Sequence, residues 1–367
     1  MMKKIISITA ISLAALFLTV SCHDPIFYMI SQEVVQEEGL QGDINSMVEF
    51  DNHLYVANGK IYKKTARPSR DTGRENGQWS ESSTSGIGSH EFVFFLAKDS
   101  TRIYAQTYQF ASDNEKSLNL PAAIRFYYST DGSTWNKINV FSITGQGSST
   151  GDSWGIGRAR IFDNKAGSAY VNLWNKDETY KVYSLNGASI SLYDSAPDDS
   201  LGAAGTQFWK SPAICKKGST YYFSFNSDKL YYYSGSASIS TLTLPTDPDN
   251  NTTELGIIPL DCDDIQSIAA TNDYLLLGTR KGIARVKLNA SGEPESHTTN
   301  FSNNAQSLVT GIVPMVFVLE PTENEGQTDE YASMTVGGVL SSSPDTFDET
   351  GLYAYYPSRG VWNRDGD

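Results

Sequence analysis

Side chains that commonly carry chemistry are scarce in this chain. Its 367 residues include three cysteines and four histidines, and no two histidines have the spacing of a metal-binding pair. Lysine and arginine form no cluster, and the net charge of −14 repels phosphate backbones, which excludes a nucleic-acid-binding protein. After the first twenty residues, no hydrophobic run is long enough to cross a bilayer. We therefore expect no metal, no cofactor and no nucleic acid among the ligands.

The N-terminus has the three parts of a secretory signal peptide. Lys3 and Lys4 precede an apolar run over Ile5–Val20, and the small residue Ser21 follows it. Cys22 comes directly after that small residue, in an order that resembles the lipobox of bacterial lipoproteins. The resemblance implies that the thiol of Cys22 is acylated and becomes the mature N-terminus, with residues 1–21 removed. It predicts a protein of the bacterial cell envelope, held to a membrane by its acyl chains.

Two other interpretations of this segment stay open. In one, an ordinary secretory signal is cut near Ser21 and Cys22 is incidental; in the other, the apolar run is a retained membrane anchor. That run is shorter than the about 20 residues that a transmembrane helix needs. A lipobox usually has Leu, Val or Ile three residues before the cysteine, whereas this chain has Thr19, a looser pattern similar to that of spirochaete lipoproteins. Residues 22–42, acidic and polar from Ser31 onward, are predicted to form a tether behind the anchor.

Cys215 and Cys262 are the two cysteines that remain. An oxidising envelope compartment allows one disulfide between them, and each lies near the start of a predicted repeat unit. Two buried thiols are the alternative, and the sequence leaves both open.

The rest of the chain repeats one pattern of short, aromatic-rich strands. Tyrosine, phenylalanine and tryptophan number 21, 16 and 6, which favours β-structure. In the first unit, strands over 47–50, 54–57 and 60–63 are separated by turns at Asp51-Asn52 and Asn58-Gly59. The Asn-Gly pair predicts a hairpin turn with positive φ at both residues. The strands of the next five units are expected at 92–97, 103–108 and 124–129; at 158–162, 170–174 and 180–185; at 211–215, 220–225 and 229–233; at 265–270, 274–278 and 283–288; and at 311–319, 331–336 and 352–356.

These six units predict an all-β fold, a six-bladed β-propeller over residues 43–367. A residue in the second strand of each unit recurs roughly every 50 to 65 positions. Units of three or four short antiparallel strands at such a period are typical of propellers. One such sheet cannot cover both of its faces, whereas radial stacking in a ring buries both. A seven-bladed ring completed by an N-terminal strand is one alternative, and a β-sandwich is another.

One turn of the second unit resembles a motif of known propellers. Ser129, Asp131, Gly132, Thr134 and Trp135 are similar in order to the Asp-box turn of sialidase-type propellers, with one residue fewer between Asp and Thr. The resemblance implies that the carboxylate of Asp131 caps backbone amides of the turn and that Trp135 packs between strands. It is a structural motif and specifies no reaction.

The same resemblance raises the hypothesis of a sialidase-like hydrolase. Such an enzyme needs three converging arginines, a tyrosine nucleophile with its glutamate, and a general acid. The Arg-Ile-Pro signature of that family is absent from the sequence. The candidate arginines on predicted inner strands and blade edges are Arg158, Arg160, Arg102, Arg125, Arg280 and Arg285.

Loop residues are better candidates for a binding face, because loops carry function on rigid scaffolds. Trp154, Phe208 and Trp209 are the aromatic ones, and the acidic segments 247–251 and 261–264 lack the residue order of a calcium loop. The sequence thus predicts a lipid-anchored envelope propeller, in the outer membrane and facing the periplasm or the surface, that binds an unknown protein or glycan partner without catalysis. An envelope glycoside hydrolase of the sialidase type and a structural factor for envelope assembly are the alternatives.

Overall fold

The computed structural model describes residues 40, 44–66, 77–109, 123–138, 159–163, 167–174, 180–192, 213–224, 229–234, 240–243, 265–279, 282–298, 312–321, 328–335, 350–357 and 361–365. All of these belong to the unit Gly39–Gly366. The predicted signal peptide (1–21), Cys22 and most of the predicted tether lie outside the described residues. Within the described ranges, the regular elements are strands, and we find no helix with the length and hydropathy that a bilayer crossing requires.

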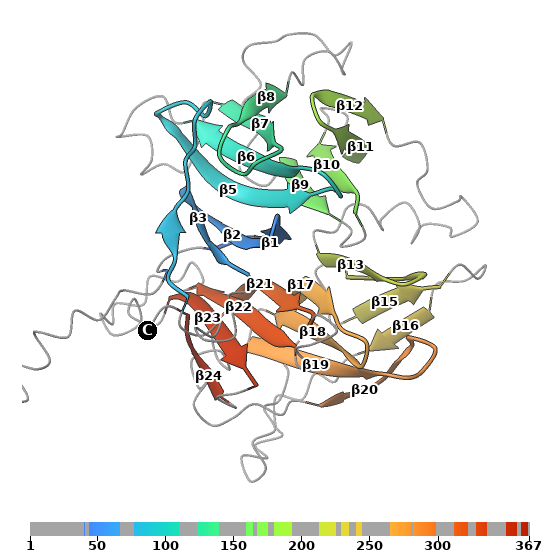
Figure 1. Cartoon of the computed structure of the whole chain (residues 1–367). Helices are drawn as coiled ribbons and strands as arrows, with labels where there is room; N and C mark the ends of the chain where they lie inside the picture. Colours follow the sequence, from blue (N-terminus) through green and yellow to red (C-terminus); the bar gives the residue numbers. More distant parts are fainter. Residues whose placement is uncertain are drawn as a thin grey trace, which may run out of the picture. The chain divides into compact units, whose positions relative to one another are not determined.

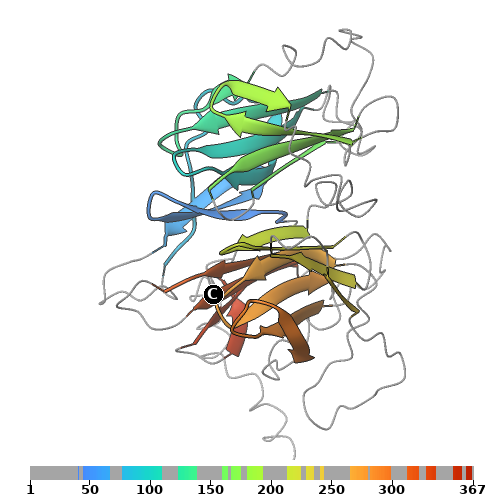
Figure 2. The same cartoon turned by 90° about the vertical axis from the view of Figure 1, so that its right-hand side faces the viewer.

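The described strands form six antiparallel sheets, which we call blades 1 to 6, each made of four consecutive strands (Figures 1 and 2). Blade 1 contains β1 (Met47–Phe50), β2 (His53–Asn58), β3 (Lys60–Thr65) and β4 (Ser80–Glu81); blade 2 contains β5 (Glu91–Lys98), β6 (Ile103–Gln109), β7 (Ala123–Ser129) and β8 (Asn136–Ile138); blade 3 contains β9 (Ala159–Asp163), β10 (Ala169–Trp174), β11 (Tyr180–Asn186) and β12 (Ser189–Leu192). Blade 4 contains β13 (Ala213–Lys217), β14 (Thr220–Ser224), β15 (Lys229–Tyr233) and β16 (Ser240–Thr243); blade 5 contains β17 (Ile265–Ala270), β18 (Tyr274–Thr279), β19 (Gly282–Leu288) and β20 (Pro294–Thr298); blade 6 contains β21 (Ile312–Leu319), β22 (Asp329–Thr335), β23 (Gly351–Tyr356) and β24 (Val361–Arg364).

The blades stack because their strands carry apolar side chains on both faces. In β18, Leu275 and Leu277 pack in the cluster shared with blade 4, whereas Leu276 packs in the cluster shared with blade 6. Successive side chains of a strand point to opposite faces, so an unbroken apolar run fills two interfaces at once. Burying each such leucine stabilises the fold by about 1.5 to 3 kcal/mol.

Six clusters of buried side chains join the blades into a closed ring. Five of them lie between consecutive blades, and the sixth joins blade 6 to blade 1. Figure 1 shows the blue strands of blade 1 beside the orange and red strands of blade 6. The predicted six-bladed propeller is therefore confirmed, and the β-sandwich alternative is wrong.

The ring closes without exchange of a strand between the chain ends. All four strands of blade 1 come from residues 47–81, and all four of blade 6 come from residues 312–364. The seven-bladed alternative, in which an N-terminal strand completes an additional blade, is therefore wrong for the described residues. The backbone N–H of Leu352 donates to the carbonyl of Leu40 at 2.9 Å, and Ile44 packs in the same buried cluster as Leu352, so the chain before β1 also contacts β23.

One turn differs from the sequence-based expectation. Positive φ was expected at both Asn58 and Gly59, but only Gly59 has it, at +70°. The two consecutive residues with positive φ are instead Asp51 and Asn52, at 45° and 58°, between β1 and β2. Gly59 also exchanges backbone hydrogen bonds of 2.9 and 2.8 Å with Val93 of blade 2, so its conformation serves an inter-blade contact as well as a hairpin.

Candidate functional site

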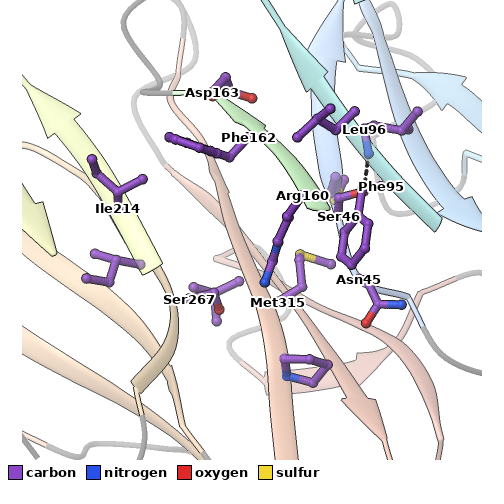
Figure 3. Close-up of a pocket in the computed structure, with 15 residues that line it drawn as sticks. Asn45, Ser46, Phe95, Leu96, Arg160, Phe162, Asp163, Ile214, Ser267 and Met315 are labelled. Atoms are coloured by element: carbon purple, nitrogen blue, oxygen red, sulfur yellow. Dashed lines mark hydrogen bonds between the residues drawn. The ribbon is translucent and has the colours of Figure 1, made fainter. Parts of the chain in front are cut away.

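The innermost strands of all six blades line one cavity in the ring (Figure 3). Its volume is about 60 Å³, and a water molecule needs about 10 to 15 Å³ by this measure, so only a few small groups fit. The polar side chains of the lining are Asn45, Ser46, Arg160, Asp163 and Ser267, and the others are apolar.

Arg160 on β9 has no carboxylate partner among the described residues. Its Cζ atom lies 4.7 Å from the centre of the Phe95 ring, a cation–π contact that covers one face of the guanidinium. Asp163 lies three residues along the same strand, which places it about 10 Å away and on the opposite face. The Asp163 carboxylate accepts a hydrogen bond from the backbone N–H of Lys98 at 3.3 Å instead. Figure 3 shows Arg160 extending across the cavity toward Ser267.

Burial lowers the pKa of Arg160 to about 10, and the neighbouring phenol of Tyr108 opposes this shift. The guanidinium stays protonated at neutral pH, because its pKa is still well above 7. Arg160 is half-buried, and a cation partly withdrawn from water without a counter-ion costs free energy, which an entering anion offsets. Arg160 is therefore a positive charge inside the ring that the described frame leaves uncompensated.

Hydrogen bonds from the neighbouring blades fix the strand that carries Arg160. The side chain of Gln106 on β6 is fully buried, and its Oε1 accepts from the backbone N–H of Ile161 at 2.8 Å. Its Nε2 donates to the Tyr108 hydroxyl at 3.2 Å, which holds the amide in this orientation. On the other side of β5, the Ser46 hydroxyl accepts from the backbone N–H of Leu96 at 2.6 Å. Neighbouring blades are thus linked here by hydrogen bonds from side chains to backbone N–H groups, where strands of one sheet would pair through their backbones. The bond from Ile161 to Gln106 holds β9 next to blade 2.

The other arginines with described side chains are paired with carboxylates of the blades. Their positions are dispersed, two in blade 2 and one in blade 5, so these side chains and Arg160 do not converge on one point. Arg158 and Arg280 lie outside the described residues. The ion pairs are Arg102 Nη1 with Asp99 Oδ2 at 3.1 Å, Arg125 Nη1 with Glu91 Oε1 at 2.5 Å, and Arg285 Nη2 with Glu330 Oε1 at 2.6 Å.

All three pairs also include a tyrosine, and the one beside Arg102 is Tyr104, whose hydroxyl donates to Asp99. The hydroxyl of Tyr127 donates to Glu91 at 2.9 Å, and that of Tyr274 donates to Glu330 at 2.7 Å. Burial and the neighbouring carboxylate of Glu91 raise the pKa of Tyr127 to about 12. Burial and the charge of Glu330 raise the pKa of Tyr274 in the same way. A phenol that acts as a nucleophile needs its pKa lowered, so both trios have the electrostatics of structural clamps.

An open groove of about 520 Å³ lies between blades 2 and 3. Asp99, Arg102 and Asn186 are among the polar residues that line it. Arg102 Nη1 donates to Asn186 Oδ1 at 2.9 Å, and Asp99 Oδ2 accepts from the Tyr104 hydroxyl at 2.5 Å. The bond between Arg102 and Asn186 crosses the interface of blades 2 and 3, and the bond between Asp99 and Tyr104 lies within blade 2. These polar groups of the groove therefore already have hydrogen-bond partners and hold the two blades together.

The turn after β7 contains the five residues that resemble an Asp-box. The Asp131 carboxylate accepts from the backbone N–H of Thr134 at 2.7 Å and from the residue before it at 2.8 Å. These bonds hold the pKa of Asp131 well below its usual range. The Ser129 hydroxyl accepts from the N–H of Gly132 at 2.9 Å, and Trp135 is buried in the cluster between blades 1 and 2. The turn is thus part of the inter-blade packing.

Several sequence-derived candidates are placed only in part. Cys215 is buried in the cluster between blades 4 and 5, whereas Cys262 lies outside the described residues, so their disulfide stays a prediction. His53 is on β2, with Nδ1 at 2.7 Å from the carbonyl oxygen of Asp51. In the part of the chain that the structure describes, no three His, Cys, Asp or Glu side chains gather as metal ligands. The aromatic candidates Trp154, Phe208 and Trp209 and the acidic segments at 247–251 and 261–264 lie outside it.

Sequence reasoning overlooked two overlapping motifs and one cluster. Residues 147–151 read Gly-Ser-Ser-Thr-Gly and residues 151–155 read Gly-Asp-Ser-Trp-Gly, each with the residue pattern of a nucleophile elbow, in a segment outside the described residues. The buried pair of Lys64 and Asp365 was also missed. Lys64 lies one residue beyond the predicted strand 60–63, so the sequence offered no signal for that pair.

No protein-family model and no curated protein matches the chain. Among solved structures, it is similar to a luciferin-regenerating enzyme, at 13% identity and a TM-score of 0.45 over 87% of this chain and 92% of that one. It is also similar to a lectin of Aleuria aurantia, at 11% identity and a TM-score of 0.41 over 85% and 89%. Regucalcin of Agrobacterium tumefaciens matches at 11% identity and a TM-score of 0.43 over 87% and 90%. The assignment of the fold stands on the six sheets and their closed ring.

Proposed function

We propose that this chain is a lipid-anchored propeller of the bacterial cell envelope that binds a protein or glycan partner without catalysing a reaction. The anchor is the acylated thiol of Cys22, and the ring over blades 1 to 6 is the rigid part that presents the connecting loops. Loops on a rigid scaffold are the usual carriers of binding in such folds.

Ion pairs between charged side chains of the blades support the binding role. Arg102, Arg125 and Arg285 each neutralise a carboxylate at a blade, and the tyrosine of each of these three clusters has a raised pKa. Such residues stiffen the ring, and a stiff ring keeps its loops in place. A rigid surface binds at a lower cost in conformational entropy than a mobile one.

An envelope hydrolase is the second candidate, because the Gly-Asp-Ser-Trp-Gly segment around Ser153 has the residues of a nucleophile elbow. That elbow works on a sharp turn from a strand to a helix, and the blades on both sides of this segment are antiparallel sheets. A panel of fluorogenic esters and glycosides tests this candidate. Turnover by the purified chain that is lost in Ser153→Ala would establish the hydrolase and refute the non-catalytic proposal.

Metabolic labelling with a fatty-acid analogue tests the anchor. We expect label on the wild-type chain and none on Cys22→Ala, while Cys215→Ser and Cys262→Ser keep it. An unlabelled wild type, or label that persists in Cys22→Ala, contradicts lipid anchoring.

Photo-crosslinking in intact cells tests the partner. Crosslinkers at Trp154 and Trp209, in segments between blades, are compared with one at Leu192, which is 53% exposed on the outer strand β12. We expect one specific adduct from the loop positions and none from Leu192. Equal or absent adducts at all three positions contradict a loop-borne binding face.

A further inference from the structure

We propose that the central cavity binds a small organic monocarboxylate, whose carboxylate pairs with the guanidinium of Arg160. The inference goes beyond the proposed function: it depends neither on the anchor at Cys22 nor on a partner at the loops, and its failure leaves both intact.

The geometry of Arg160 suits a carboxylate. The Phe95 ring, 4.7 Å from Cζ, lies over a face of the guanidinium, whereas hydrogen bonds are donated in its plane. A carboxylate accepts two such bonds in parallel, and the planar fork of arginine matches this arrangement better than the point charge of a lysine does. No described carboxylate or carbonyl takes these donors, in contrast to Arg102, Arg125 and Arg285.

The size and lining of the cavity limit the rest of the ligand. A volume of about 60 Å³ is well below the about 150 Å³ of a cavity that holds benzene, so a sugar ring does not fit inside. Phe162, Ile214, Pro314 and Met315 form apolar walls that suit a short alkyl stem. The cavity therefore fits an acid of about two to four carbons, because each methylene group takes part of the remaining space.

The charge balance favours a monoanion over a dianion or an acidic protein. Arg160 is the single cation among the residues of this lining, and Asp163 is an anion of the same lining, so the lining offers no second cation to pair with a second negative charge on the ligand. The net charge of −14 on the whole chain repels acidic protein surfaces, and a small acid with one charge is repelled far less.

Isothermal titration calorimetry on the full chain in detergent tests the proposal with sodium propionate. Propionamide has the same shape without the charge, and sodium phosphate supplies a larger anion at matched ionic strength. We expect saturable binding of propionate with a Kd near or below about 1 mM. Propionamide should bind at least about tenfold more weakly, because it lacks the charge that pairs with Arg160.

Three variants make the assignment specific. Arg160→Met keeps an unbranched apolar stem without the charge and should abolish propionate binding, and Arg160→Lys should weaken it by about tenfold or more because the fork is lost. Ser189→Ala changes an exposed serine of β12 that does not line the cavity and should leave affinity unchanged. Arg160→Met should melt no lower than the wild type, since it removes an uncompensated charge. This melting temperature shows that a loss of binding is not a loss of folding.

The proposal is overturned if propionate shows no saturable binding up to about 50 mM, which is far above a Kd in the millimolar range. It is also overturned by equal affinity in Arg160→Met, by equal affinity for propionamide, or by tighter binding of phosphate than of propionate. A short acidic peptide that binds more tightly than propionate also overturns it, because the cavity would then take a protein side chain.

Discussion

Lys64 and Asp365 meet across the seam of the ring, with Nζ of the lysine 2.5 Å from Oδ2 of the aspartate. Both side chains are 1% exposed, although the residues are 301 positions apart in the chain. Asp365 also accepts from the Tyr356 hydroxyl at 2.6 Å and from Trp79 Nε1 at 2.8 Å. A buried ion pair thus joins the first and last blades, and its carboxylate accepts two further hydrogen bonds. No described strand is exchanged between these two blades.

Replacing Lys64 with methionine should open this seam. The substitution leaves the Asp365 carboxylate buried without its cation, and breaking a buried pair from one side costs about 3 to 5 kcal/mol. Urea unfolding followed by circular dichroism should show a loss of this size in the free energy of unfolding.

Two controls separate the buried pair from charge in general. Lys60→Met removes a lysine of the same strand whose pair with Glu81 is exposed, and it should change stability little. The double variant Lys64→Met/Asp365→Leu removes both charges and should recover part of the loss, because Tyr356 and Trp79 then lack their acceptor on Asp365. If Lys64→Met were as stable as Lys60→Met, the pair would not hold the seam.

Gly132 and Gly218 give a matched test of the turn between β7 and β8. Both have positive φ, at +68° and +58°, so Ala strains the backbone by about 1 to 2 kcal/mol at either position. A Cβ atom at Gly132 would also overlap the Tyr55 hydroxyl oxygen, whereas nothing lies within 4 Å at Gly218. Gly132→Ala should therefore lose about 1 to 3 kcal/mol more than Gly218→Ala in urea unfolding. Equal losses would mean that Tyr55 moves aside without cost.

The blades were predictable because their information is local. A stretch such as Leu275–Leu277 is apolar on both faces, and turn residues punctuate the chain between such strands at a regular period. The predicted strands agree with the observed ones within two residues. The fourth strands were harder to predict, because outer strands such as β4 (Ser80–Glu81) are exposed and carry little hydrophobic signal.

The site and the seam were less predictable because they depend on distant residues. Arg160 was recognised as a candidate on an inner strand, but its isolation depends on which carboxylates the fold brings near each arginine; Glu330, for example, pairs with Arg285 of the neighbouring blade, 45 positions away. Gln106 fixes the backbone of Ile161 from another blade, 55 positions away in the sequence. The spacing of residues along one strand does not predict contacts with residues of another blade.

The stability supplied by Asp131 should depend on pH with a defined sign. Backbone hydrogen bonds from Thr134 and its neighbour lower the pKa of this carboxyl in the folded protein. Its contribution is then fully present above the unfolded pKa of about 4 and is lost as the pH falls through the folded pKa. The difference in urea midpoint between the wild type and Asp131→Ala should be largest at neutral pH and shrink in acid. A difference that is the same at pH 7 and in strong acid contradicts the carboxylate cap.

Tyr127 should show the opposite dependence at high pH. Burial and Glu91 raise its pKa to about 12 in the folded state, against about 10 for an exposed phenol. The folded protein therefore has full stability from this group below pH 10 and loses it as the pH rises from there toward 12. In Glu91→Gln the repulsion between carboxylate and phenolate is gone but burial remains, so the pKa of Tyr127 should fall to a value between these two limits.

Carbon-13 NMR of tyrosine Cζ measures this titration, with the Tyr127 signal assigned by its loss in Tyr127→Phe. Glu295→Gln removes an exposed carboxylate of blade 5 that pairs with Lys287, and it should leave the Tyr127 curve unchanged. An unchanged curve in Glu91→Gln as well would show that burial alone holds the phenol neutral. In that case the trio of Glu91, Arg125 and Tyr127 would contribute to the frame through the ion pair and not through the phenol.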